Sequence, residues 1–150
     1  MLTLPYLKET LKFQFSDLVD LDKQVIESAG GYDGIVSLIQ TKGITPMIIL
    51  ENSEIGEFSF RPGGFIKSSQ SIWVMKMVGR DGDRTKVQKE CFAMMRNILA
   101  LFGQHEKDDC LAQWEWDRVP WGVRNAAANF TGYEFTMYFA EDFCLEDHNG

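Results

Sequence analysis

The hydrophobic pattern of the chain is clearest between Ile72 and Phe102. A mostly apolar run from Ile72 to Val78 predicts a strand, and the polar stretch Gly79–Asp83 ends it. A long helix is predicted next, because apolar residues recur at steps of three and four and form one continuous face. That face consists of Val87, Cys91, Met94, Met95, Ile98, Leu99 and Phe102. A strand that leads into such a helix can lay the helix across a sheet, so this segment specifies much of the core.

The first 43 residues predict short helices. A weak helical pattern covers Leu4–Leu11, with Pro5 in the first turn, where its missing N–H costs nothing. Residues 18–26 fit either a short helix or a loop packed against the rest of the protein. A further helix is expected from Tyr32 to Gln40 and should end near Gly43 in a C-cap. Its inward residues would be Ile35, Leu38 and Ile39.

The pattern changes period after Pro46. The apolar run Met47–Leu50 predicts a buried strand, and Ile55–Phe60 is expected to pair with it across a turn at Asn52 and Ser53. A wide connection, Arg61–Gly64, then leads to the Ile72–Val78 strand.

The C-terminal third predicts two more strands. The polar segment Gly103–Asp109 is expected to form a loop after the long helix, and Gln113–Val119 a strand that Pro120 ends. The clearest alternation is that of Phe130–Phe139. One face of this strand would carry Tyr133, Phe135, Met137 and Phe139, and the other Glu134, Thr136 and Tyr138.

These elements predict one α+β domain over residues 1–150. Its mixed or mainly antiparallel sheet would be covered on one face by the long amphipathic helix. Short helices would form the N-terminal part, 1–43, and the sheet and long helix would occupy 44–143. A disordered tail is expected at 144–150. The chain contains no internal repeat and no low-complexity linker.

Composition and charge narrow the class of protein. A chain of 150 residues that is 45% hydrophobic and 13% aromatic can bury one good core, and disorder would not tolerate so many aromatic residues. The formal net charge is −7. Nucleic-acid binding is not expected, because it depends on clustered Lys and Arg and the chain has no basic stripe.

The three cysteines, Cys91, Cys110 and Cys144, form no CxxC pair, and one would be left over in any disulfide scheme. Cys91 lies on the apolar helix face, where it would act as a small hydrophobic residue. A reducing, cytoplasmic location fits this pattern. No leader pattern opens the chain and no apolar run could span a bilayer, so no membrane is predicted as a partner.

Candidate catalytic and metal-binding residues have simpler explanations. The segment His105–Cys110 combines an imidazole, carboxylates and a thiol, but its spacing matches no metal signature. Asp81 and Asp83 resemble the start of a calcium loop, yet Thr85 stands where the next ligand is required. Asp83 is instead expected to cap the long helix. We therefore predict no metal, no cofactor and no small-molecule substrate.

The tryptophan-rich stretch is the strongest functional signal. Trp114, Trp116 and Trp121 lie within eight residues. Either they pack under the long helix or they anchor an interface, as Trp and Arg often do. Trp121, which follows Pro120, is the one expected to be most exposed. The intervening carboxylates Glu115 and Asp117 are expected to face solvent.

The order of elements resembles that of a known family. A strand that a proline starts, Thr45–Glu51, follows the helical N-terminal part. The strand Ser71–Val78, a polar loop and the long helix come next, and an aromatic strand with an early glycine, Asn129–Phe135, closes the pattern. This order, over roughly Pro46–Phe139, resembles the small tail terminator or tail completion proteins of long-tailed bacteriophages and prophages. The resemblance lies in pattern and element order, since no catalytic motif defines that family.

The resemblance implies a non-enzymatic structural protein that forms a ring, typically of six subunits. Such a ring caps the tail tube and helps to join it to the head. The implied partners are copies of the chain itself and other tail or head–tail proteins, and the protein would be a virion component. Ring contacts would fall on Asn52–Glu54, Arg61–Ser69, the Gly79–Asp83 turn and Trp121. The expected interface residues are Arg61, Phe65, Arg80, Asp81, Asp83, Arg118 and Trp121.

Two features depart from the family pattern, namely the long N-terminal portion, Met1–Gly43, and the tryptophan-rich strand. Two other classes of function therefore stay open. One is a small hydrolase or ligand-binding domain that uses the His105–Cys110 region, with Trp114 and Trp116 as a pocket wall. The other is a cytoplasmic adaptor that presents its aromatic residues to one protein partner.

Overall fold

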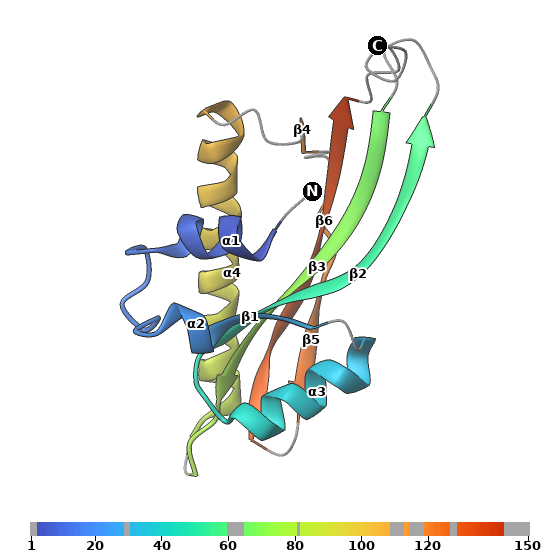
Figure 1. Ribbon diagram of the computed structural model, residues 1–150. Helices are drawn as coiled ribbons and strands as arrows, with labels where there is room; N and C mark the ends of the chain where they lie inside the picture. The colour runs from blue at the N-terminus through green and yellow to red at the C-terminus, as the bar shows by residue number, and fades with distance from the viewer. Residues whose placement is uncertain are drawn as a thin grey trace.

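The computed structural model describes residues 3–28, 31–59, 65–80, 82–108, 113–114, 119–126 and 129–142. Its strands are β1 (Val25–Ser28), β2 (Met47–Ser59), β3 (Phe65–Met77), β4 (Gln113–Trp114), β5 (Trp121–Ala126) and β6 (Phe130–Asp142). Its helices are α1 (Leu4–Leu11), α2 (Leu21–Gln24), α3 (Gly31–Lys42) and α4 (Arg84–Asp108). The protein is a single α+β domain, as the pattern predicts (Figure 1).

All strands belong to one mixed sheet with the order β1-β2-β3-β6, and β4 and β5 both pair with β6. The β1–β2 pair is parallel, and every other described pair is antiparallel. The two central pairings, β2 with β3 and β3 with β6, run the full length of 13-residue strands. The sheet is therefore long and narrow, and the ends of β2, β3 and β6 form an arm that curves away from α3 (Figure 1).

The larger part of the core lies between the sheet and α4, with α1 packed beside α4. This cluster consists of Leu7, Leu11, Val25, Ile48, Leu50, Ile72, Val74, Cys91, Met94, Met95, Ile98, Phe102, Phe135 and Met137. The predicted apolar face of the long helix is confirmed, since five of its members belong to this cluster and Val87 and Leu99 pack against it. Burial of this face is what holds the helix on the sheet.

A second cluster on the opposite face corrects the prediction of a sheet covered on one face only. Here α3 packs its buried residues Ile35 and Ile39 against the sheet. The sheet contributes Met47, Ile49, Trp73, Met75, Ala126 and Phe130. The continuous apolar run Met47–Leu50 signals this arrangement, because a strand buried on both faces has no polar alternation.

The N-terminal part supplies a strand as well as helices. Residues 18–26, expected as a helix or a packed loop, instead contain the one-turn helix α2 and the start of β1. The side chain of Gln24 stabilises the junction between α2 and β1, because its amide nitrogen donates to the carbonyl oxygens of Asp17 and Pro46, at 3.0 and 3.2 Å. The predicted end of α3 is confirmed. Gly43 has φ +60°, and its N–H donates to the Ile39 carbonyl at 3.0 Å.

The predicted turn at Asn52 and Ser53 is wrong. Both apolar runs belong to the single strand β2, and the register against β3 shifts between Glu51 and Ile55, which is the mark of a bulge. The reason is that β3 is itself 13 residues long and can pair with both runs in succession. A bulge accommodates the extra residues without ending the strand.

The predictions for the C-terminal third are partly confirmed. The expected loop at Gly103–Asp109 is wrong, because α4 continues to Asp108, past the unfavourable Gly103 and through Gln104, Glu106 and Lys107, which have good helix propensity. Of the predicted Gln113–Val119 strand, only β4 is described, and residues 115–118 lie outside the described residues. The strand β5 was not predicted.

The alternating strand Phe130–Phe139 is confirmed as β6 and extends to Asp142. Its early glycine has a clear packing role. A Cβ atom at Gly132 would collide with the Val74 carbonyl oxygen of β3. Glycine therefore permits the close approach of β6 to β3 at this point.

Candidate functional site

Three aromatic side chains from three separate elements meet on the α4 side of the sheet. Trp121 of β5 pairs in register with Phe135, so it shares a face with Tyr133 of β6. Phe92 of α4 lies across this face. The ring centroids are 5.4 Å apart for Phe92–Trp121, 5.3 Å for Phe92–Tyr133 and 5.5 Å for Trp121–Tyr133, all edge to face. This is the preferred geometry of aromatic pairs, so the three rings stabilise one another.

The cluster is only partly covered. Trp121 is 56% exposed and Val123, two residues along β5, is 41% exposed. Together, Phe92, Trp121, Val123 and Tyr133 form a patch that we call the aromatic flank. It extends from α4 to the outer strand of the sheet, and it places more apolar surface in one area than single exposed residues would.

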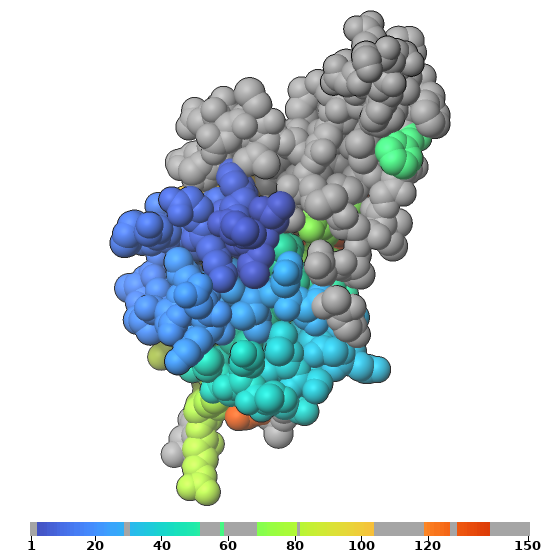
Figure 2. Space-filling model, in the orientation of Figure 1, coloured from blue at the N-terminus to red at the C-terminus, as the bar shows by residue number. Residues whose placement is uncertain are grey.

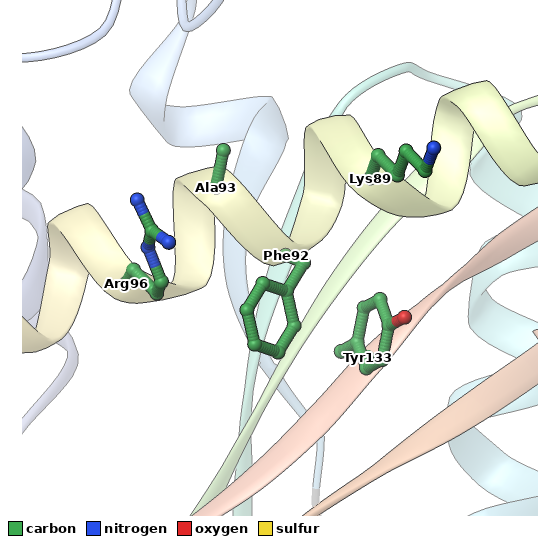
Figure 3. Close-up of a pocket in the computed structure, with 5 residues that line it drawn as sticks. All are labelled: Lys89, Phe92, Ala93, Arg96 and Tyr133. Atoms are coloured by element: carbon green, nitrogen blue, oxygen red, sulfur yellow. The ribbon is translucent and has the colours of Figure 1, made fainter.

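An open pocket of about 340 Å³ lies beside the aromatic flank (Figure 3). Its lining residues are Lys89, Phe92, Ala93, Arg96 and Tyr133. On α4 these positions follow steps of three and four, so Lys89 and Arg96 lie on either side of Phe92 along one stripe. Both cations are exposed, and neither pairs with a carboxylate in the described part of the chain. The pocket therefore suits an aromatic or apolar group that carries negative charge close by.

The opposite face of the sheet carries a second group of aromatic and charged residues. Trp73 is buried, contacts Tyr32 of α3 at 5.5 Å between ring centroids, and donates from Nε1 to Glu51 at 3.3 Å. The guanidinium of Arg124 lies 5.9 Å from the Trp73 ring and donates to Glu134 Oε2 at 2.7 Å. The indole N–H, the guanidinium and both carboxylates here have partners, so this cluster attaches α3 and β5 to the sheet.

Lys76 of β3 joins parts of the molecule that are distant in sequence. Its Nζ lies 3.1 Å from Glu90 of α4 and 3.5 Å from Asp17, which follows α1. Burial by itself lowers the pKa of Lys76, but the hydrogen bonds and negative charges of Glu90 and Asp17 outweigh this effect and raise the pKa above 10.5. Lys76 is therefore a fixed cation that links three elements.

Cys91 behaves as the small buried residue that its position in the helix predicts. Its side chain is fully buried, and burial raises the pKa of the thiol to about 12. At neutral pH it is a protonated thiol without nucleophilic character. Cys110 and Cys144 are not among the described residues.

Among the described residues, the predicted interface positions lie in separate parts of the molecule. Phe65 opens β3 and pairs with Asp142 at the end of the arm, whereas Arg80 and Asp83 follow the other end of β3. Trp121 is exposed, as expected. Arg61, Asp81 and Arg118 lie outside the described residues, and so does the side chain of Phe65.

Asp83 has the capping role that the sequence predicts. Its Oδ1 accepts from the backbone N–H of Thr85 at 3.0 Å and of Lys86 at 3.4 Å. Arg80 and Asp83 are exposed in the turn before α4. As a capping residue, Asp83 has a structural explanation that requires no partner.

The alternative site at His105–Cys110 lies largely outside the description. His105 belongs to α4, but its side chain and residue Cys110 are not described, and neither are Glu115, Trp116 and Asp117. Trp114 pairs with Phe139 through the backbone of β4. Within the described residues, no three His, Cys, Asp or Glu side chains lie close enough to share a metal ion. No described helix is long and apolar enough to cross a bilayer.

Sequence reasoning missed most of the aromatic flank. Tyr133 is expected on the apolar face of its strand, and Phe92 is not among the residues expected on the apolar face of the helix. The sequence offers no signal that these two residues adjoin Trp121, because β5 was not predicted. A comparison with models of known protein families found no match, and a comparison with curated proteins found no significantly similar chain.

Proposed function

We propose that the protein is a non-enzymatic structural subunit that assembles with copies of itself into a ring and with other proteins of a phage or prophage tail. The order of its elements resembles that of tail terminator and tail completion subunits. The observation that carries the proposal is the aromatic flank. Its exposed residues, Trp121 above all, are of the kind that anchors protein interfaces.

The shape of the sheet supports assembly by repeated contacts. Among the described residues, β1 pairs only with β2, and β5 pairs only with β6. The sheet therefore has two different borders, one parallel and one antiparallel. A contact between two different surfaces repeats from copy to copy and forms a ring when the rotation closes.

The charge distribution also supports assembly of the chain with copies of itself. A chain with a net charge of −7 repels its own copies unless cations meet carboxylates at the contact. Lys89 and Arg96 supply such cations beside the aromatic flank. Arg80 in the exposed turn before α4 is a further candidate for contacts with a neighbouring subunit.

The exposure of Trp121 also suits the adaptor alternative, in which the aromatic flank binds one different protein. The two functions differ in what the purified protein does alone. A ring subunit associates with itself as its concentration rises, whereas an adaptor stays monomeric and requires its partner.

Sedimentation velocity and light scattering over a wide concentration range test the proposal, together with electron microscopy of the most concentrated sample. We expect reversible assembly into particles larger than dimers, with ring-shaped particles in the images. A protein that remains monomeric or dimeric at every concentration contradicts the ring and favours the adaptor.

A further inference from the structure

An exposed aromatic residue stands on the segment between α1 and α2. Phe13 is 92% exposed and has φ +66°, a left-handed backbone conformation that bulky residues rarely adopt. The ammonium of the adjacent Lys12 lies 5.2 Å from the centroid of its ring. By contrast, Phe15 and Leu18 of the same segment pack against the core. The backbone at Phe13 is therefore strained while its large apolar side chain lies in solvent. Strained backbone conformations of this kind cluster at functional sites.

The same segment continues into an acidic run. Asp17, Asp20 and Asp22 surround Val19, which is 87% exposed, and the run Asp17–Asp22 contains no cation. The three carboxylates form ion pairs with lysines outside the run, at 3.1 to 3.9 Å. The pairs of Asp20 and Asp22 are solvent-exposed on the acidic side, so they contribute little and can be exchanged for other partners, whereas Asp17 stays with the half-buried Lys76. We call residues 13–22 the acidic knob.

The acidic knob and the pocket lie on opposite flanks of α4. On one flank, Gln14 and Phe15 lie beside Asn97, Ala100 and Leu101, and Asp17 approaches Glu90 through Lys76. On the other flank, Phe92 points toward Tyr133, and Lys89 and Arg96 lie along the helix on either side of Phe92 (Figure 3). Figures 1 and 2 place the segment after α1 (blue) at the left edge of the molecule. A knob on one flank cannot enter a pocket on the other flank of the same chain.

We propose that the acidic knob of one copy inserts into the pocket of the next copy, with Phe13 against Phe92 and Tyr133. The carboxylates of the acidic run then face Lys89 and Arg96. This inference rests on the proposed ring and identifies its two contact surfaces. Because knob and pocket are different surfaces on opposite flanks, the contact is head-to-tail and can close into a ring.

Opposite charge and matched apolar groups argue for a second copy as the occupant. Among the described residues, the pocket has aromatic walls and two cations without carboxylate partners, while the knob has an exposed phenyl ring, an exposed valine and the exchangeable carboxylates of Asp20 and Asp22. Insertion would remove Phe13 from water and place its ring among aromatic edges and faces, the arrangement that such rings prefer.

Two variants that each destroy one surface test the contact. Phe13→Gly removes the ring and suits the positive φ, so the melting temperature should stay equal or rise. The double variant Lys89→Glu/Arg96→Glu reverses both exposed cations without touching the core. We expect each variant alone to remain monomeric, or to need at least about tenfold more protein to assemble, because apolar contact or charge complementarity is lost.

A mixture of the two variants gives the sharpest result. Each retains one intact surface, so an equimolar mixture should form heterodimers and nothing larger. Phe58→Ala, an exposed phenylalanine on the arm, and Lys86→Glu, a charge reversal elsewhere on α4, are matched controls that should assemble like the original protein.

The outcomes separate the two proposals. Suppose that the original protein forms rings. If the two variants form rings as well, or if their mixture forms no heterodimer, the knob-and-pocket contact is wrong but the proposed ring is not affected. If the original protein never exceeds a dimer, the ring itself is wrong, and this contact with it. Monomeric variants with lowered melting temperatures would point to damaged folding and also contradict the inference.

Discussion

Trp73 and Trp121 show how one residue type serves two purposes in this protein. Trp73 is 1% exposed and lies between α3 and the sheet, with its Nε1 bound to Glu51. Trp121 contacts the rings of Phe92 and Tyr133, but 56% of its surface is exposed to water. Burial makes Trp73 a packing residue, while partial exposure leaves Trp121 available for a partner.

We expect Trp73→Ala to lower the free energy of unfolding by about 3–5 kcal/mol, because it leaves a cavity. Trp121→Ala should cost only about 1–2 kcal/mol, since it loses two aromatic contacts and little burial. Urea denaturation of both variants measures the difference. A cost for Trp121→Ala as large as that for Trp73→Ala would show that Trp121 is a core residue, contrary to its role in the aromatic flank.

At the scale of elements, α4 positions Phe92 of the aromatic flank and the two cations beside it. Its apolar face fixes its rotation on the sheet, and this rotation directs Phe92 toward Tyr133 and leaves Lys89 and Arg96 at the surface. The start of the helix is set by Asp83, whose carboxylate satisfies two backbone N–H groups. Capping and apolar burial therefore act together to place the helix.

Asp83→Ala should lower the free energy of unfolding by about 1 kcal/mol, because the first turn of α4 loses its cap. Asp83→Asn should restore most of this loss, since asparagine caps helices nearly as well. Chemical denaturation of the three proteins, followed by circular dichroism, measures the effect. Equal stability of the alanine variant and the original protein would mean that the cap contributes nothing.

At the scale of the whole molecule, Lys76 connects the sheet, α4 and the segment after α1. Both Lys76 and Cys91 have a pKa that is higher in the folded protein than in the unfolded chain. A group of this kind contributes stability that is complete below its unfolded pKa and disappears as the pH rises through its folded pKa. The affected range begins near pH 9 for Cys91, whose folded pKa is about 12, and above pH 10.5 for Lys76.

We therefore expect the melting temperature to fall as the pH rises above about 9, in a protein kept reduced. Cys91→Ala should reduce the fall that begins near pH 9, and Lys76→Met the part above pH 10.5. Lys86→Met, a change at an exposed lysine, serves as the control. If the melting temperatures of all four proteins decline in parallel, neither buried group governs the alkaline stability.

The elements that the sequence predicts well are those whose burial is periodic. The apolar helix face from Cys91 to Phe102 and the alternating strand Phe130–Phe139 each have one side that is buried at regular intervals. Both predictions are confirmed. The prediction failed where a local signal competed with a long-range partner. Asn52 and Ser53 favour a turn, but pairing with the long strand β3 outweighs that preference and leaves a bulge.

The candidate site was harder to predict, since its parts depend on which strands become neighbours. Trp121 could be singled out by its residue type. Its contacts with Phe92 and Tyr133 could not be foreseen, because they join residues 29 and 12 positions apart and require β5 to pair with β6 in one register. The exposed Phe13 carries no sequence signal, since its neighbours Phe15 and Leu18 are equally apolar and yet pack, half-buried, against the core.

The amino-acid sequence by itself determined the α+β class, the long amphipathic helix, its cap and the last strand, because propensity and periodicity act over a few neighbouring residues. Only the tertiary structure decided that α3 covers the second face, that β2 is continuous, and which apolar side chains remain in water. Exposure is a property of the packed chain, since a side chain is buried only when residues distant in sequence come to cover it. The surfaces through which this protein would assemble are therefore a consequence of the fold and are not written in any one segment.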